Sequence, residues 1–171
     1  MLLNLERAHT AEDQPVVLPS ETVVVETRFG TYEFAPNETV MMPHGLVGFA
    51  EQQLFGLGNL PAPVPEDFKL LQSLGEPPIS FVVLPVSSDE APIEAADLDE
   101  ACAAAGFVRG EIHVMFLCTI RPKDNGEGID MWANIRAPIL FDIEAQRARQ
   151  YVLPNSRYSM RQSLDNWNGE L

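Results

Sequence analysis

Residue patterns that mark common classes of enzyme are missing from this 171-residue sequence. It has no Gly-x-Ser-x-Gly motif, no Cys-x-x-Cys pair and no His-Glu-x-x-His motif. The three histidines, His9, His44 and His113, fall in an N-terminal arm, a turn and a buried strand. Gly56-Leu57-Gly58 is followed by prolines rather than by a helix that could bind a pyrophosphate. A catalytic triad scattered in sequence leaves no motif, but nothing here indicates one, and we expect a binding protein without catalytic activity, cofactor or metal.

Cysteine is also scarce, and long apolar runs are lacking. Cys102 and Cys118 are too few for a disulfide framework, so we expect both thiols to be buried, reduced and inert. No run reaches the roughly 18 apolar residues of a membrane-spanning helix. The first residues show neither the basic segment nor the apolar segment of a signal peptide. The simplest expectation is a cytoplasmic protein.

Basic residues are rare in the first two-thirds of the chain. Residues 1–108 contain 3 basic and 17 acidic side chains, whereas residues 109–171 contain 8 of each, so the whole net charge of −14 arises in the first part. Direct binding to nucleic acid is not expected, because its affinity comes mainly from Lys and Arg that neutralise phosphates. An acidic surface attracts a basic protein partner, although acidity can also serve solubility alone.

The central element that the sequence predicts is a strand over residues 111–121. Ile112, Val114, Phe116, Cys118 and Ile120 alternate with Met115 and Leu117, so both faces are apolar. Such a strand is covered on both sides, as in a sheet that closes or folds over on itself. Asn125-Gly126 then predicts a hairpin to a strand over 129–136.

Shorter strands and one helix complete the predicted fold. The helix spans residues 97–105, with acidic residues in its first turn and Gly106 after it. The fold class is therefore mainly β: a compact antiparallel β-barrel-like single domain with one or two short helices. We expect a flexible arm over 1–20, the β domain over 21–160 and a tail over 161–171. Further predicted strands are 22–26, 28–34, 39–42, 68–73, 79–86 (ended by Pro85), 137–141 and 148–153.

An acidic segment precedes and begins the predicted helix. It has no basic residue to compensate it between Asp89 and Glu100. A calcium loop starting at Asp97 would need Gly at its sixth position, which is absent. The simplest interpretation is a solvated helix end, and a protein-binding surface is the alternative.

Several short motifs occur in one order and give a more specific indication. They are Phe29-Gly30, Pro43-His44-Gly45-Leu46-Val47-Gly48-Phe49, Phe55, Leu71-Gln72-Ser73, Ser80-Phe81-Val82-Val83, Asn134-Ile135-Arg136-Ala137-Pro138-Ile139 and Gln150. Together they resemble the FliW family of flagellar assembly factors over roughly residues 22–160. Two positions depart from the family pattern: Val47 replaces a proline, and Ala50 replaces an acidic residue.

The resemblance implies a non-enzymatic protein that binds newly made flagellin in the cytoplasm. It also implies binding to CsrA, a small RNA-binding translational regulator that represses flagellin mRNA, with the two partners competing. Alternatives are a chaperone for flagellin alone and a β-barrel that encloses a small ligand.

Candidate contact residues can be chosen, each with a structural alternative. Phe49 suits the core as well as a contact, and the polar candidates could instead close local turns. We expect Gly45 and Gly48 to serve turn geometry. The predicted protein-binding residues are Phe49, Gln72, Ser73, Asp97, Asp99, Glu100, Asn134 and Arg136.

Overall fold

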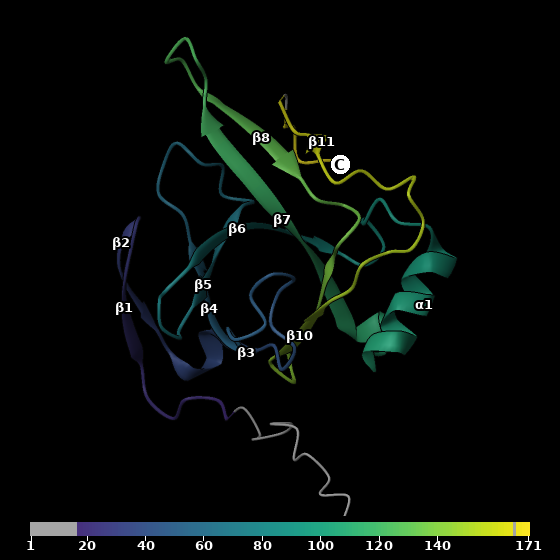
Figure 1. Cartoon of the computed structure of the whole chain (residues 1–171), viewed down its shortest axis with the longest axis horizontal. Coiled ribbons are helices and arrows are strands. Elements are labelled where there is room, and N and C mark those ends of the chain that lie inside the picture. The colour runs from purple at the N-terminus through teal and green to yellow at the C-terminus, as the bar shows by residue number, and fades with distance from the viewer. Residues whose placement is uncertain (1–16, 166) are drawn as a thin grey trace, which may run out of the picture.

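The computed structural model describes residues 17–165 and 167–171, and most of its strands join one large sheet. The expected arm lies largely in residues 1–16, outside the described residues. The strands are β1 (Val23–Thr27), β2 (Gly30–Phe34), β3 (Thr39–Met41), β4 (Leu54–Asn59), β5 (Lys69–Ser73), β6 (Ser80–Ser87), β7 (Ile112–Pro122), β8 (Ile129–Ala133), β9 (Ile139–Asp142), β10 (Arg147–Gln150) and β11 (Gln162–Ser163). The helix α1 spans Ala95–Ala105, with 3₁₀ turns at Pro36–Glu38 and Arg109–Glu111. Figure 1 shows the β1–β2 hairpin and α1 at opposite ends of the molecule.

The large sheet closes on itself through β7. Its order among the described residues is β11-β8-β7-β6-β5-β4-β3-β10-β9, and β9 pairs again with β7. The first half of β7 pairs with β9, from Ile112 opposite Asp142 to Met115 opposite Ile139. Its second half pairs with β8, from Cys118 to Pro122. All neighbours are antiparallel except β10 and β3, which share one parallel pair. The mainly β, barrel-like fold class is confirmed.

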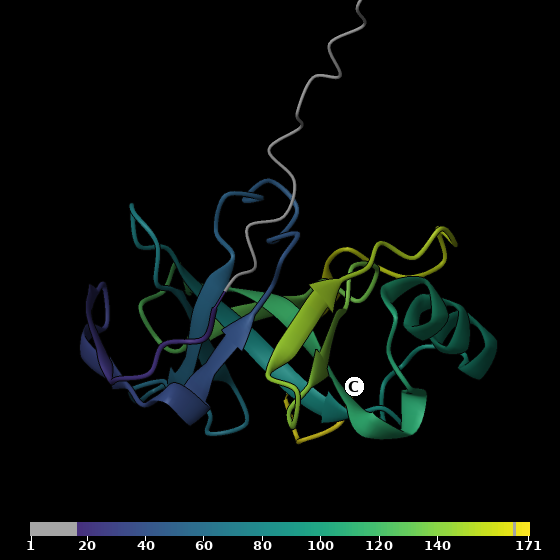
Figure 2. The same cartoon turned by 90° about the horizontal axis from the view of Figure 1, so that it is seen from below.

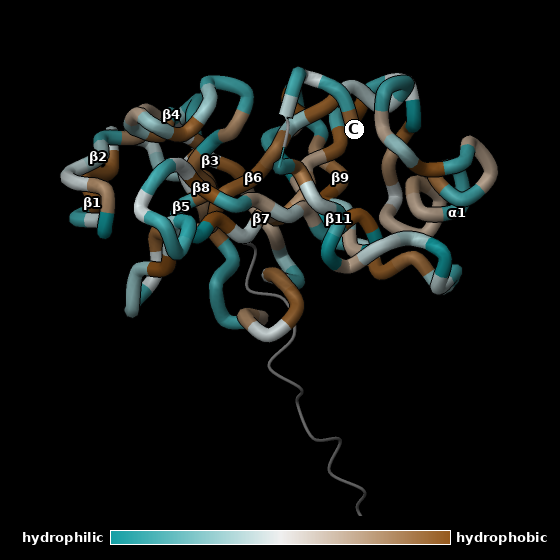
Figure 3. Tube along the Cα trace, turned by 90° about the horizontal axis from the view of Figure 1, so that it is seen from above, coloured by the Kyte–Doolittle hydropathy of each residue, from teal (hydrophilic) through white to brown (hydrophobic). Residues whose placement is uncertain are grey.

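The two faces of β7 enter two different cores, as its alternation predicts. Ile112, Val114 and Phe116 are buried in an outer core beneath α1 and the C-terminal segment. Met115 lies in the inner core that the closed sheet encloses, and Leu117 packs against it. His113 belongs to this strand, but its side chain is exposed, unlike the apolar residues beside it. Figure 2 shows α1 at one end of the molecule, beside the curved strands. In Figure 3, hydrophobic stretches concentrate within the strands, and many of the outer turns are hydrophilic.

Strand β6 does not end at Pro85, which corrects the sequence prediction. β6 continues to Ser87, and Pro85 lies opposite Met115 of β7. The neighbouring strand β5 pairs with β6 only as far as Val83. Pro85 therefore has one strand neighbour, and the missing N–H is tolerated where a strand forms an edge.

Strand β4 was not predicted, because glycines weaken strands in general. Here a Cβ at Gly56 would lie 2.4 Å from the ring of Phe34, and one at Gly58 would lie 3.2 Å from it. The two glycines therefore make room for β2 to pack on β4. Two predicted strands end earlier than expected, β8 at Ala133 and β10 at Gln150, and β11, which follows both, was not predicted.

The predicted helix is confirmed and begins two residues earlier, at Ala95. Gly106 ends it in the left-handed conformation, with φ of 77°. None of the helices that the structure describes is long and apolar enough to cross a membrane.

Candidate protein-binding site

The loop between β3 and β4 is held in one shape by its own backbone. The N–H of Gly45 donates to the carbonyl of Met42 (2.8 Å), and that of Phe49 donates to Leu46 (2.8 Å). Gly45 and Gly48 have φ of +61° and +84°, as their predicted turn roles require. Leu46 is buried in the inner core and anchors the loop. The loop is thus a rigid feature of the surface.

The side chain of Gln150 connects this loop to a second motif segment. The side-chain oxygen of Gln150 accepts a hydrogen bond from the N–H of Val47 (2.8 Å). The amide nitrogen of Gln150 donates to the carbonyl of Ala137 (3.1 Å). One side chain therefore joins the loop to β10, 103 residues away, and to the Asn134–Ile139 motif.

The loop presents apolar side chains to solvent. Val47 is 68% exposed and Phe49 is 38% exposed. The Phe49 ring packs edge-to-face on Phe81 of β6, with 5.2 Å between ring centroids. We call Val47, Phe49 and Phe81 the loop tip. An exposed apolar group on a rigid loop is a common feature of protein-binding surfaces.

Gln72 and Ser73 are fully buried in β5. The Gln72 amide accepts a hydrogen bond from the Ser80 hydroxyl and donates to the carbonyl of Ser73. The Ser73 hydroxyl accepts a hydrogen bond from the N–H of Ile79 (2.7 Å). These side chains close the turn between β5 and β6 and support Phe81, and they present no polar atom to a partner in this conformation.

Asn134 and Arg136 are half-buried where the chain leaves β8. The Asn134 side-chain oxygen accepts from the N–H of Ala137 (3.2 Å), and Arg136 donates to the carbonyl of Leu153 (3.3 Å). Asn134 stabilises the local turn, and Arg136 connects it to the segment that follows β10. Their predicted contacts with a partner remain predictions.

The acidic residues at the start of α1 are partly neutralised by two arginines that lie outside the helix. Arg157 contacts the carboxylates of Glu94 (2.7 Å) and Asp97 (3.1 Å), and Arg109 contacts Asp99 (2.8 Å). Hydrogen bonds to Glu94 and Tyr158 raise the pKa of Arg157, and the bond to Asp99 raises the pKa of Arg109. The segment from Asp89 to Glu100 contains no basic residue, yet three of its carboxylates are paired with arginines outside it.

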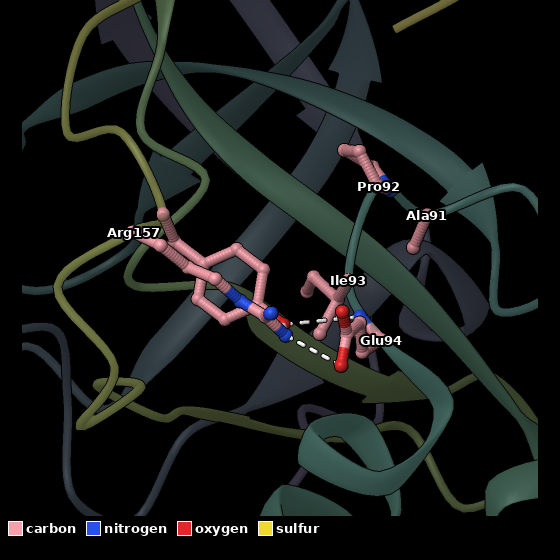
Figure 4. Close-up of a pocket in the computed structure, with 6 residues that line it drawn as sticks. Ala91, Pro92, Ile93, Glu94 and Arg157 are labelled. Carbon is pink, nitrogen blue, oxygen red and sulfur yellow. Dashed lines mark hydrogen bonds and ion pairs between the residues drawn. The ribbon is translucent and has the colours of Figure 1, made fainter.

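Tyr158 completes this connection between α1 and the C-terminal segment. Its hydroxyl donates to Asp97 and accepts from the N–H of Glu94 (3.0 Å). Figure 4 shows Arg157 extended toward Glu94. Both residues line a shallow hollow of about 500 Å³. Glu100 stays exposed on α1. Of the predicted acidic residues, Asp97 is half-buried and connects α1 to Arg157 and Tyr158, whereas Asp99, paired with Arg109, and Glu100 are exposed.

Within residues 17–165 and 167–171, no three His, Cys, Asp or Glu side chains are grouped to hold an ion. Burial raises the pKa of Cys118 to about 12 and also raises the pKa of Cys102, where Arg109 partly opposes the effect.

Sequence reasoning missed the roles of several residues. Gln150 was one of the motif residues that resemble the FliW family, and this was the only sign in the sequence of its structural role. Arg157 and Tyr158 follow the last predicted strand in a polar segment, and nothing in the local sequence could place them at α1.

The closed sheet and its apolar loop define a compact β-barrel-like scaffold with exposed apolar side chains. The family model described as FliW protein matches residues 23–164. The chain belongs to the FliW family of flagellar assembly factors, which act in bacterial flagellum biogenesis.

Individual relatives agree with this assignment. The flagellar assembly factor FliW of Desulfitobacterium hafniense (strain Y51) is 31% identical over 82% of this chain and 90% of its own. That of Magnetococcus marinus is 31% identical over 81% of this chain and 82% of its own. A crystal structure of the flagellar assembly factor FliW superposes with a TM-score of 0.58 at 21% identity, over 84% of this chain and 96% of the other.

Proposed function

We propose that this protein binds flagellin and sequesters CsrA in the cytoplasm, coupling flagellin synthesis to export without catalysing a reaction. Family membership supports the assignment to flagellar assembly, and the resemblance implies the two partners. Release of flagellin by export would free the protein to capture CsrA and lift the repression of flagellin mRNA.

The loop tip is the observation that carries the flagellin part of the proposal. Flagellin's terminal segments, as the resemblance implies, form amphipathic helices with an apolar stripe. Such a helix binds by laying that stripe against exposed apolar side chains. Val47 and Phe49 are exposed, and the hydrogen bond that the Val47 N–H donates to Gln150 holds the loop before binding. A preorganised loop loses little conformational entropy when a partner docks.

The charge distribution supports the CsrA part. The excess of negative charge lies in residues 1–108, and Asp89, Glu90 and Glu100 are exposed near or on α1. An RNA-binding protein carries positive charge to neutralise phosphates. A negatively charged surface steers such a partner and repels RNA.

The deciding experiment measures binding of the purified full chain to flagellin and to CsrA, separately and together, by calorimetry. The proposal expects saturable binding of each and displacement of one by the other. Binding of neither partner would contradict it. Simultaneous binding of both would contradict the competition between them.

A matched pair of variants tests the loop tip. Phe49→Ser should weaken flagellin binding at least tenfold, because it removes an apolar contact worth more than about 1.4 kcal/mol. Val24→Ser on β1 alters another exposed valine, 59% exposed, and should leave binding unchanged. Equal affinity of Phe49→Ser and the unchanged protein would place the flagellin site elsewhere.

The second candidate function is a chaperone for flagellin alone. Val47 and Ala50 favour it, because both depart from the family pattern at the loop that carries the exposed apolar residues. It predicts tight flagellin binding and no measurable binding to CsrA in the same calorimetric experiment.

A further inference from the structure

A second aromatic group lies on the same side of the sheet as the loop tip. Alternate residues of β6, β7 and β8 point to one face. On the outer-core face are Val82, Cys118 and Met131. The opposite face, which continues from the inner core, therefore carries Phe81, Thr119 and Trp132.

Register places these three residues in one row across the sheet. Val82 is opposite Cys118, so Phe81 comes next to Thr119, and Thr119 is directly opposite Trp132. Neighbouring strands are about 4.8 Å apart, so Phe81 and Trp132 are separated by roughly 10 Å. Thr119 between them is exposed, so no large side chain of β7 interrupts the row. The loop tip and Trp132 thus belong to one continuous surface.

Two arginines flank Trp132. The guanidinium carbons of Arg121 and Arg161 lie 5.9 and 4.7 Å from the centroid of its ring. Both arginines are exposed. Among the described residues, no carboxylate forms an ion pair with either, whereas Arg109 and Arg157 are both paired. The indole orients two positive charges whose donors are available to a partner.

We propose that this surface takes one amphipathic helix of a partner, with apolar side chains on the loop tip and carboxylates on Arg121 and Arg161. Arginine binds carboxylate through two parallel hydrogen bonds, which fixes the direction of the helix. Residues seven apart on a helix are about 10.5 Å apart along its axis, which matches the row from Phe81 to Trp132. The partner helix therefore carries its apolar anchor and its carboxylate about two turns apart.

Charge argues for a carboxylate-bearing helix over nucleic acid. Asp130 lies across from Arg121 on β8, and the chain as a whole carries −14. A phosphate backbone brings many charges into that field, whereas a helix with one or two carboxylates places them only at the arginines. The apolar loop tip at the other end of the row also has no counterpart in a phosphate backbone.

The test rests on the proposed function, because it uses flagellin as the probe. Two sets of variants separate flagellin binding itself from the role of the two arginines. The double variant Arg121→Gln with Arg161→Gln should weaken flagellin binding at least fivefold at low salt, and 1 M salt should remove most of that difference. Phe49→Ser should weaken binding at both salt concentrations. Arg28→Gln is the matched control, since Arg28 stacks on Phe29 at 4.8 Å in the β1–β2 turn. It should bind as the unchanged protein does.

Each outcome has a distinct meaning. If flagellin does not bind at all, the proposed function fails. If flagellin binds and Phe49→Ser weakens it while the double arginine variant does not, the proposed function stands and the inference about the arginines is overturned. Binding of an oligouridylate RNA that the double variant loses would overturn it in favour of nucleic acid. Concentration-dependent dimerisation in sedimentation, lost in the same variant, would overturn it in favour of a second copy of this chain. An unchanged circular dichroism spectrum confirms that the variants fold.

Discussion

At the scale of single residues, Gly45 sets the shape of the loop that presents Phe49. Its φ of +61° is costly for any residue with a side chain, and the space beside it is filled. A Cβ would lie 2.4 Å from the Phe49 carbonyl oxygen and 2.7 Å from the Cα of Ala50. Backbone conformation and close packing therefore both require glycine.

Gly45→Ala should lower the free energy of unfolding by at least about 2 kcal/mol, because strain and overlap add. For a chain of this size, that lowers the melting temperature by roughly 4–8 °C. Thermal unfolding followed by circular dichroism measures it. Gly48→Ala is the control: φ is +84° but no atom lies within 4 Å, so the loss should be only about 1 kcal/mol.

The two thiols allow a chemical prediction at the same scale. Burial raises the pKa of Cys118 to about 12, and it raises the pKa of Cys102 too. Only the thiolate reacts with iodoacetamide, so native protein at pH 8 should be alkylated far more slowly than protein unfolded in urea. Mass spectrometry measures the label. Rapid labelling of native protein would contradict the burial of Cys102 and the partial burial of Cys118.

The same shifts give a sign for stability at high pH. The folded pKa of Cys118 lies above the value of 9.0 that applies to an exposed thiol. The folded state therefore keeps its proton longer than the unfolded state. The contribution of this thiol to stability is complete below about pH 9 and is lost as pH rises toward 12.

At the scale of elements, the β1–β2 hairpin depends on one packing contact with the large sheet. Phe34 is 1% exposed, and its ring covers Gly56 of β4. Tyr32 stacks on Phe34 and donates its hydroxyl proton to the carbonyl of Asn59 (2.7 Å). A two-stranded hairpin is marginally stable alone, so this contact holds it in place.

Phe34→Ala should cost about 3–5 kcal/mol, since it empties a buried aromatic site. Amide hydrogen exchange should rise in β1 and β2 first, because that hairpin loses its support. Tyr32→Phe removes only one hydrogen bond and should cost about 1 kcal/mol. Equal protection of β1 and β2 in Phe34→Ala would show that the hairpin is held by other contacts.

At the scale of the whole molecule, the proposed function assigns different roles to charge and to exposed apolar surface. The negative charge arises in residues 1–108, while Arg121 and Arg161 flank Trp132 near the loop tip. In the proposed function, the negative charge attracts CsrA over a long range. The two arginines and the loop tip make the direct contact with a helix.

Binding to CsrA should therefore weaken steeply as salt rises from 50 to 500 mM, because surface charges are screened within roughly 10 Å at 0.1 M. The double variant Glu90→Gln with Glu100→Gln should reduce the association rate several-fold. Glu144→Gln with Glu170→Gln removes the same charge in the final third of the chain and should change it less. Surface plasmon resonance measures both rates. Binding that is insensitive to salt would contradict the electrostatic part of the proposal.

The sequence by itself determined the class of fold. The alternation of β7 predicted a strand buried on both faces, Gly106 predicted the end of α1, and the ordered motifs indicated the family. These signals are local, because side-chain period and backbone preference are properties of neighbouring residues.

Only the tertiary structure decided how distant residues combine. Strand β4 was missed because Phe34, twenty-two residues earlier, fills the space over Gly56. Three other features arise in the same way. They are the pairing of Arg157 with α1, the hydrogen bond from the loop to Gln150, and the row from Phe81 to Trp132. Each depends on strand register and sheet closure, which bring together residues whose local sequences carry no sign of one another.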